Sequence, residues 1–137
     1  MKTILLIEDD PRDVELAHRA LVKSAISAEI VVATDGFRAL DILMSSEPNR
    51  PIELILLDLK LPKMDGLEVL RKIRNDAKTK LIPVVVLTSS LEERDLIESY
   101  VAGCNSYVRK PVDFTQFVDA VRQLGLYWLV INQPVPT

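Results

Sequence analysis

Residues 54–62 read LILLDLKLP, so an acidic residue, Asp58, directly follows a run of four apolar residues. A continuous apolar run of this kind is typical of a strand buried on both faces, as in a parallel sheet. In open parallel α/β sheets, ligands bind at the carboxyl ends of the strands. Asp58 is therefore placed where such a protein carries its chemistry.

Three other apolar runs in the chain also end in polar residues. They are residues 4–7 before Glu8 and Asp9, residues 84–87 before Thr88, and residues 107–108 before Arg109 and Lys110. If these strands are parallel, their carboxyl ends lie at one edge of a sheet. One pocket would then contain three carboxylates, a hydroxyl group and an ammonium group.

This combination of side chains favours phosphoryl chemistry. Crowded carboxylates repel one another unless a cation lies among them, and Mg²⁺ is a hard ion that prefers oxygen ligands. Lys110 and Thr88 could bind an anion on the other side of the pocket. A metal ion and an ammonium group stabilise the charge of a phosphoryl group during transfer, while a carboxylate can act as the nucleophile. We therefore expect a Mg²⁺-dependent site for phosphoryl groups.

Short aliphatic runs alternate with amphipathic stretches along the chain, a pattern typical of an α/β protein with a parallel sheet. Strands are expected near residues 3–8, 29–33, 53–58, 83–88 and 105–109. Helices are expected near residues 11–24, 36–45, 66–76, 91–101 and 114–126. Because the third and fourth strands are apolar almost throughout, they should lie at the centre of the sheet.

Capping residues mark the ends of the expected helices. Four residues with side-chain oxygens precede expected helices and are predicted to cap them: Asp10, Asp65, Ser90 and Asp113. Gly103 is predicted to end the fourth helix in the left-handed conformation. We assign Asp10 to capping alone.

Composition limits the classes of protein to consider. The 137 residues match one domain, and 48% hydrophobic content supplies a sizeable core. The 17 basic residues are interspersed with 20 acidic ones, which argues against a nucleic-acid surface. No apolar run approaches the ~20 residues of a membrane span, so no membrane association is expected. The lone Cys104 cannot form an internal disulfide, which favours a cytoplasmic location.

At these residues the chain resembles the receiver domain of two-component response regulators, over residues 1 to about 126. LIEDD at 6–10 is similar to the family's acidic pair, and LDLKLPKMDG at 57–66 is similar to its phosphoacceptor segment. LTS at 87–89 and YVRKP at 107–111 match its hydroxyl and lysine positions. The resemblance implies a flavodoxin-like three-layer sandwich, with five helices and a five-stranded parallel sheet in the order 2-1-3-4-5.

The resemblance also implies how the matched residues act. Asp58 would accept a phosphoryl group from a phosphohistidine of a partner sensor histidine kinase. Asp58 and Asp9 would bind Mg²⁺ directly, Glu8 would act through water, and Lys60 would contribute its backbone carbonyl. Lys110 would contact a phosphoryl oxygen. Such a receiver catalyses only its own phosphorylation and dephosphorylation.

Two switch residues and a cis peptide are implied in the same way. Thr88 would act in catalysis and move toward the attached phosphoryl group, and Tyr107 would swing inward into the vacated space. The family usually has a cis peptide before the matched proline, so a cis bond is expected between Lys110 and Pro111.

The chain continues beyond residue 126, where a minimal receiver would end. Residues 127–131 are apolar and would be unfavourable in water. Similar tails occur in stand-alone regulators paired with bacterial and cyanobacterial phytochrome kinases, which the chain resembles. We expect residues 1–126 to be the receiver domain and residues 127–137 to be the arm of a homodimer; the alternative is a tail that folds back on its own domain. The expected dimer residues are Tyr127, Trp128, Leu129, Val130 and Ile131.

Two other functions are alternatives to a phosphorylated signalling module. An aspartyl-phosphate phosphatase of the haloacid dehalogenase type would carry a second Asp two residues after Asp58, but Lys60 occupies that position. A receiver-like dimerisation module that is never phosphorylated would usually lack an acidic residue or the lysine, and this chain keeps them all. The phosphorylated signalling module is therefore the leading interpretation.

Overall fold

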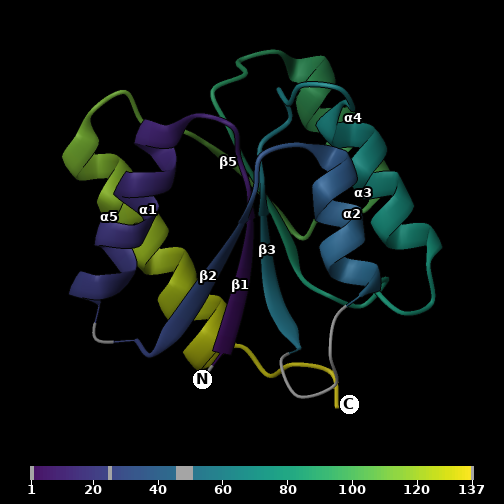
Figure 1. The fold of residues 1–137 in the computed structure, drawn as a ribbon. Coiled ribbons are helices and arrows are strands. Elements are labelled where there is room, and N and C mark those ends of the chain that lie inside the picture. Colours follow the sequence, from purple (N-terminus) through teal and green to yellow (C-terminus); the bar gives the residue numbers. More distant parts are fainter. Residues whose placement is uncertain (1, 25, 46–50, 137) are drawn as a thin grey trace.

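The structure of the protein, a computed structural model, describes residues 2–24, 26–45 and 51–136 (Figure 1). The strands are β1 (Lys2–Ile7), β2 (Ala28–Ala33), β3 (Ile52–Leu57), β4 (Val84–Thr88) and β5 (Ser106–Arg109). The helices are α1 (Pro11–Lys23), α2 (Gly36–Met44), α3 (Gly66–Asn75), α4 (Glu93–Ala102) and α5 (Phe114–Leu126), and α5 leads into a π-helical turn, η1 (Tyr127–Ile131).

The strands form one parallel sheet in the order β2-β1-β3-β4-β5, which confirms the predicted fold. Helices α1 and α5 cover one face of the sheet, and α2, α3 and α4 cover the other (Figure 1). Within the described ranges, no helix combines the length and the apolar character that crossing a membrane requires.

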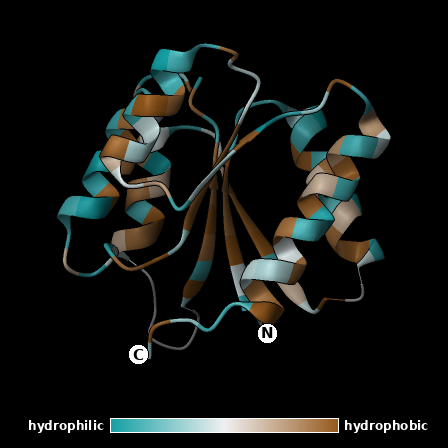
Figure 2. Ribbon diagram, turned by 180° about the vertical axis from the view of Figure 1, so that it is seen from behind, coloured by the Kyte–Doolittle hydropathy of each residue, from teal (hydrophilic) through white to brown (hydrophobic). Residues whose placement is uncertain are grey.

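The central strands are buried on both faces, as their continuous apolar sequences predict. Successive residues of β1 alternate between two core clusters: Leu5 and Ile7 pack beneath α2 and α3, whereas Ile4 and Leu6 pack beneath α1 and α5. β3 and β4 alternate in the same way. Figure 2 shows the strands as a hydrophobic layer between helices whose outward faces are more polar.

Three of the four predicted N-caps and the predicted C-cap are confirmed. The side chains of Asp10, Asp65 and Asp113 each accept a hydrogen bond from a backbone N–H in the first turn of the following helix. Gly103 ends α4 with a φ of 108°, a left-handed conformation that favours glycine.

The start of α4 differs from the prediction. The helix begins at Glu93 rather than at residue 91, and Ser90 is not its N-cap. The Ser90 hydroxyl instead accepts a hydrogen bond from the Glu92 N–H (3.2 Å) and donates one to Asp95 (2.6 Å). These bonds form a turn ahead of the helix, so local side-chain bonding delays its start.

The segment after α5 is part of the folded structure. Leu129 is only 1% exposed and lies in the core cluster beneath α1 and α5, with Trp128 packed partly against it. The Lys2 ammonium donates a hydrogen bond to the Leu129 carbonyl, which ties η1 to β1. The expectation of a partner surface is therefore wrong for Leu129, because burial within its own domain removes the side chain from water. Tyr127, Val130 and Ile131 remain exposed.

Candidate phosphoryl-acceptor site

The register of the sheet brings Glu8 and Asp58 together. Ile7 pairs with Leu57 between β1 and β3, and the Asp58 N–H donates to the Ile7 carbonyl (3.0 Å). Both strands end one residue earlier than predicted, so Glu8 is the first residue after β1 and Asp58 is the first residue after β3. Both acids are buried, with Glu8 3% and Asp58 7% exposed.

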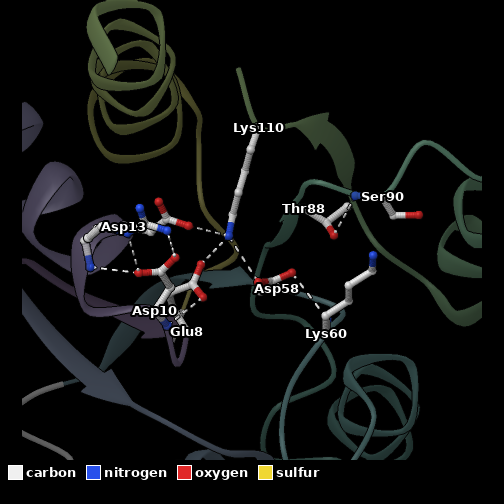
Figure 3. A network of polar contacts seen from close by, with 9 residues as sticks. Glu8, Asp10, Asp13, Asp58, Lys60, Thr88, Ser90 and Lys110 are labelled. Carbon is white, nitrogen blue, oxygen red and sulfur yellow. Dashed lines mark hydrogen bonds and ion pairs between the residues drawn. The ribbon is translucent and has the colours of Figure 1, made fainter. Parts of the chain in front are cut away.

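The half of the sheet formed by β4 and β5 positions Lys110. Thr88 pairs with Arg109 between β4 and β5, and the Lys110 N–H donates to the Thr88 carbonyl (2.8 Å). From this anchor the Lys110 side chain reaches across the pocket toward the acids (Figure 3). Among the described residues no peptide bond is cis, so the predicted cis bond between Lys110 and Pro111 is wrong. The trans form is the one that X–Pro bonds intrinsically prefer.

The Lys110 ammonium contacts three carboxylates. Its Nζ lies 2.5 Å from a Glu8 oxygen, 2.8 Å from an Asp13 oxygen and 3.1 Å from an Asp58 oxygen. The lysine side chain is only 9% exposed. These contacts fix the position of the charge, since a lysine ammonium has only three N–H groups to donate.

Burial and charge act against each other on these groups. Burial raises the pKa of Glu8 to about 7, although the hydrogen bond and the charge of Lys110 act to lower it. Burial acts to lower the pKa of Lys110, but the hydrogen bonds from its ammonium to Asp13 and Glu8 outweigh this effect, and its pKa is raised. The ammonium is therefore held in its charged form, whereas the effect of burial on the Glu8 carboxylate exceeds what the lysine offsets.

The acidic residues fit a divalent cation. Oxygen atoms of Glu8, Asp9 and Asp58 all lie within 4.8 Å of one another. Asp9 is exposed, whereas the other two are buried, so the group opens to solvent on one side. Clustered carboxylates of this kind bind hard cations such as Mg²⁺ and Mn²⁺.

Lys60 and Thr88 take different positions around Asp58. The Lys60 N–H donates to an Asp58 oxygen at 3.3 Å, so the chain turns tightly around the carboxylate. Thr88 is completely buried, and its hydroxyl accepts a hydrogen bond from the Ser90 N–H (3.3 Å). Figure 3 shows Thr88 and Ser90 on the opposite side of Asp58 from Glu8. The movement of Thr88 stays a prediction.

Tyr107 lies on β5 and packs against the core cluster beneath α2 and α3. Its hydroxyl oxygen is already buried, and no hydrogen-bond partner is found for it within the described residues. Burial raises the pKa of this phenol. Its inward swing on phosphorylation stays a prediction.

Sequence reasoning missed the part that Asp13 plays. Asp13 lies in the first turn of α1, and its carboxylate reaches a lysine 97 residues away. The sequence offers no local signal for this contact, because it depends on how α1 packs against the sheet. A pocket of about 720 Å³ opens at this place, and its lining includes Glu8, Asp9, Asp13, Asp58 and Lys110.

Comparison with known proteins agrees with this geometry. Residues 4–122 match the model of the response regulator receiver domain. The chain is 40% identical over 135 residues to response regulator Rcp1 of Synechocystis sp., covering 93% of this chain and 89% of that protein.

Solved structures point the same way. The phosphorylated cyanobacterial phytochrome response regulator RcpA is 38% identical, with a TM-score of 0.91 over 98% of this chain and 99% of that one. The Mn²⁺-bound form of Rcp1 is 38% identical, with a TM-score of 0.90 over 99% and 100%. The bacteriophytochrome response regulator AtBRR is 49% identical, with a TM-score of 0.72 over 97% and 99%. The chain belongs to the response regulator receiver domain family, a family of phosphoryl-accepting signalling domains rather than classical enzymes.

Proposed function

We propose that Asp58 is the phosphoryl acceptor and that a sensor histidine kinase is the donor. An Asp58 oxygen attacks the phosphorus of a phosphohistidine, the P–N bond breaks, and the imidazole nitrogen leaves with its electron pair and takes up a proton. The observation that carries the proposal is the convergence of Lys110 and the acidic group on Asp58. Lys110 stabilises negative charge on the phosphoryl oxygens during this transfer. Thr88 assists by hydrogen bonding to the attached group, and the same residues act in dephosphorylation.

Mg²⁺ is the proposed metal ion. Asp9 and Asp58 would bind it directly, Glu8 would act through water, and Lys60 would contribute its backbone carbonyl. When bound, the ion supplies positive charge that balances the carboxylates and the phosphoryl oxygens. The clustering of Glu8, Asp9 and Asp58 supports this assignment, because Lys110 contacts only two of these three carboxylates among the described ion pairs. The Mn²⁺-bound form of the similar protein Rcp1 supports it as well.

The proposed kinase is of the phytochrome type, and the proposed location is the cytoplasm. Support comes from the similarity to RcpA and AtBRR, which are described as phytochrome and bacteriophytochrome response regulators. The protein then signals through protein contacts, without binding nucleic acid. Thr88 and Tyr107 carry the change from the acceptor to the surface.

A homodimer is part of the same proposal. Residues 127–137 contribute the exposed side chains of Tyr127, Val130 and Ile131 to a surface for a second copy. Trp128, which is partly buried against its own domain, borders this surface.

Incubation with acetyl phosphate, with and without Mg²⁺, tests the acceptor. We expect intact mass to show the gain of one phosphoryl group that requires Mg²⁺ and is lost in Asp58→Asn. Asp119→Asn is the matched control, because the same chemical change then falls on an exposed carboxylate paired with Arg122. Sedimentation of the same samples tests the dimer. No phosphorylation of the native chain by acetyl phosphate or by a phytochrome-type kinase would favour a module that is never phosphorylated.

A further inference from the structure

Asp13 contacts the Lys110 ammonium from α1, whereas Glu8 and Asp58 contact it from the ends of β1 and β3. It lies in the first turn of α1, and its carboxylate accepts a hydrogen bond from the Lys110 ammonium at 2.8 Å. The Asp13 side chain is 21% exposed and that of Lys110 is 9% exposed. This contact lies on the side of the ammonium away from Thr88 (Figure 3).

The acids around Lys110 are not equivalent. Glu8 and Asp58 belong to the group of described carboxylates that could share a cation, whereas Asp13 does not. A cation in that group competes with Lys110 for the oxygens of Glu8 and Asp58. Phosphorylation also converts Asp58 from a carboxylate into an acyl phosphate. Among the carboxylates of the described residues, Asp13 is therefore the one partner of Lys110 that neither event engages.

We propose that Asp13 is a positioning residue, which keeps the Lys110 ammonium in the pocket and oriented toward the phosphoryl group. The inference rests on the proposed phosphorylation of Asp58. Two N–H groups of the ammonium then remain free for phosphoryl oxygens or for Glu8 while the third stays on Asp13. Asp13 acts on the reaction only through Lys110.

A purely structural role for Asp13 makes a different prediction. An acid in the first turn of a helix interacts favourably with the helix dipole, and its removal would lower stability without moving Lys110. Glu15→Gln is a suitable control, because Glu15 is an exposed acid on the same helix and pairs only with Arg19 among the ion pairs of the described residues (3.1 Å).

The first measurement is the rate of phosphorylation by acetyl phosphate at saturating Mg²⁺. For Asp13→Asn we expect the rate at saturating donor to fall about tenfold, the size of effect that follows from losing a hydrogen bond between charged groups. Asp13→Glu should recover part of the loss, and Glu15→Gln should match the native chain. Thermal unfolding of each variant identifies any loss of activity caused by unfolding.

The second measurement follows the lysine directly by the ¹H–¹⁵N NMR signal of its ammonium group in the metal-free protein. Held by three carboxylates, the Lys110 ammonium should give its own slowly exchanging signal, which Lys110→Arg identifies by its absence. Asp13→Asn should broaden or shift this signal, and Glu15→Gln should not. An unchanged signal in Asp13→Asn would overturn the inference, whatever the rate.

The two proposals fail in different ways. If the native chain is not phosphorylated, the proposed function fails, and the ammonium signal still reports whether Asp13 holds Lys110. If the native chain is phosphorylated and Asp13→Asn reacts at the rate of Glu15→Gln, the proposed role of Asp13 is overturned while the proposed function stands.

Discussion

Replacing Leu129 with alanine tests whether the C-terminal segment is part of the domain core. Leu129 is 1% exposed, so the variant loses nearly the whole transfer free energy of the removed carbon atoms and leaves a cavity among buried side chains. Buried Leu→Ala changes lower the free energy of unfolding by about 2–5 kcal/mol. Because η1 is a short segment that can shift to fill part of the cavity, we expect about 2–3 kcal/mol.

Urea unfolding at two protein concentrations measures this change. With a slope of about 2 kcal/mol per molar urea, the midpoint should fall by roughly 1–1.5 M. Circular dichroism follows the whole domain, and the fluorescence of Trp128, the only tryptophan, follows the tail. If the tail unfolds together with the domain, the two transitions coincide. Val22→Ala is the control, because Val22 is 81% exposed on α1 and lies outside the proposed dimer surface, so this change should alter stability by less than about 0.5 kcal/mol.

Two results would refute the reasoning. A Leu129→Ala variant as stable as Val22→Ala would show that the Leu129 side chain is not packed in the core. A loss of stability that depends on protein concentration would show that Leu129 is buried against a second copy rather than within its own domain.

Two further predictions concern the loop beside the acceptor and the lone thiol. Gly66→Ala would place a Cβ 2.5 Å from the Asp58 carbonyl oxygen and 2.6 Å from the Leu59 Cα, so the backbone must shift; stability should fall by about 1–3 kcal/mol, together with phosphorylation. Gly125→Ala meets the ends of two side chains, Leu21 (2.9 Å) and Ile26 (3.6 Å), and should change stability by less than about 1 kcal/mol in urea unfolding; equal losses would contradict the steric argument. Burial raises the pKa of Cys104, although the Arg74 charge acts to lower it. At pH 8 its thiolate fraction is therefore below that of an ordinary cysteine, and a thiol-specific chromogenic reagent should react slowly with the native chain and quickly in urea. A native rate equal to that of a free thiol would contradict the burial.

The elements of the fold and their parallel arrangement followed from local patterns, whereas the strand order followed from the resemblance to receiver domains. The apolar run before Asp58 predicted a buried strand, and strand propensity alternating with helical periodicity predicted a parallel sheet. The caps at Asp10, Asp65 and Asp113 depend on hydrogen bonds that span only a few residues, so the sequence is sufficient to predict them. The start of α4 was misplaced because Ser90 bonds both to the backbone before the helix and to Asp95 within it.

The site could be assembled from sequence only as far as the strand ends reach. Parallel strands bring their carboxyl ends to one edge, so Glu8, Asp58 and Lys110 could be predicted to meet. Which carboxylate Lys110 contacts, and how closely, depends on the packing of α1 against the sheet. That packing brings Asp13 to a lysine 97 residues away, and no local pattern encodes it.

The sequence by itself determined the elements, their parallel arrangement and the residues that surround Asp58, because propensity, periodicity and capping act over a few neighbouring residues. Only the tertiary structure decided that Asp13 shares Lys110 with Glu8 and Asp58, and that Leu129 lies in the core while Val130 faces water. The sequence pattern of an apolar tail is the same whether the tail packs on its own domain or on a second copy. The choice depends on the space left between α1, α5 and the sheet, which exists only once those elements have packed together.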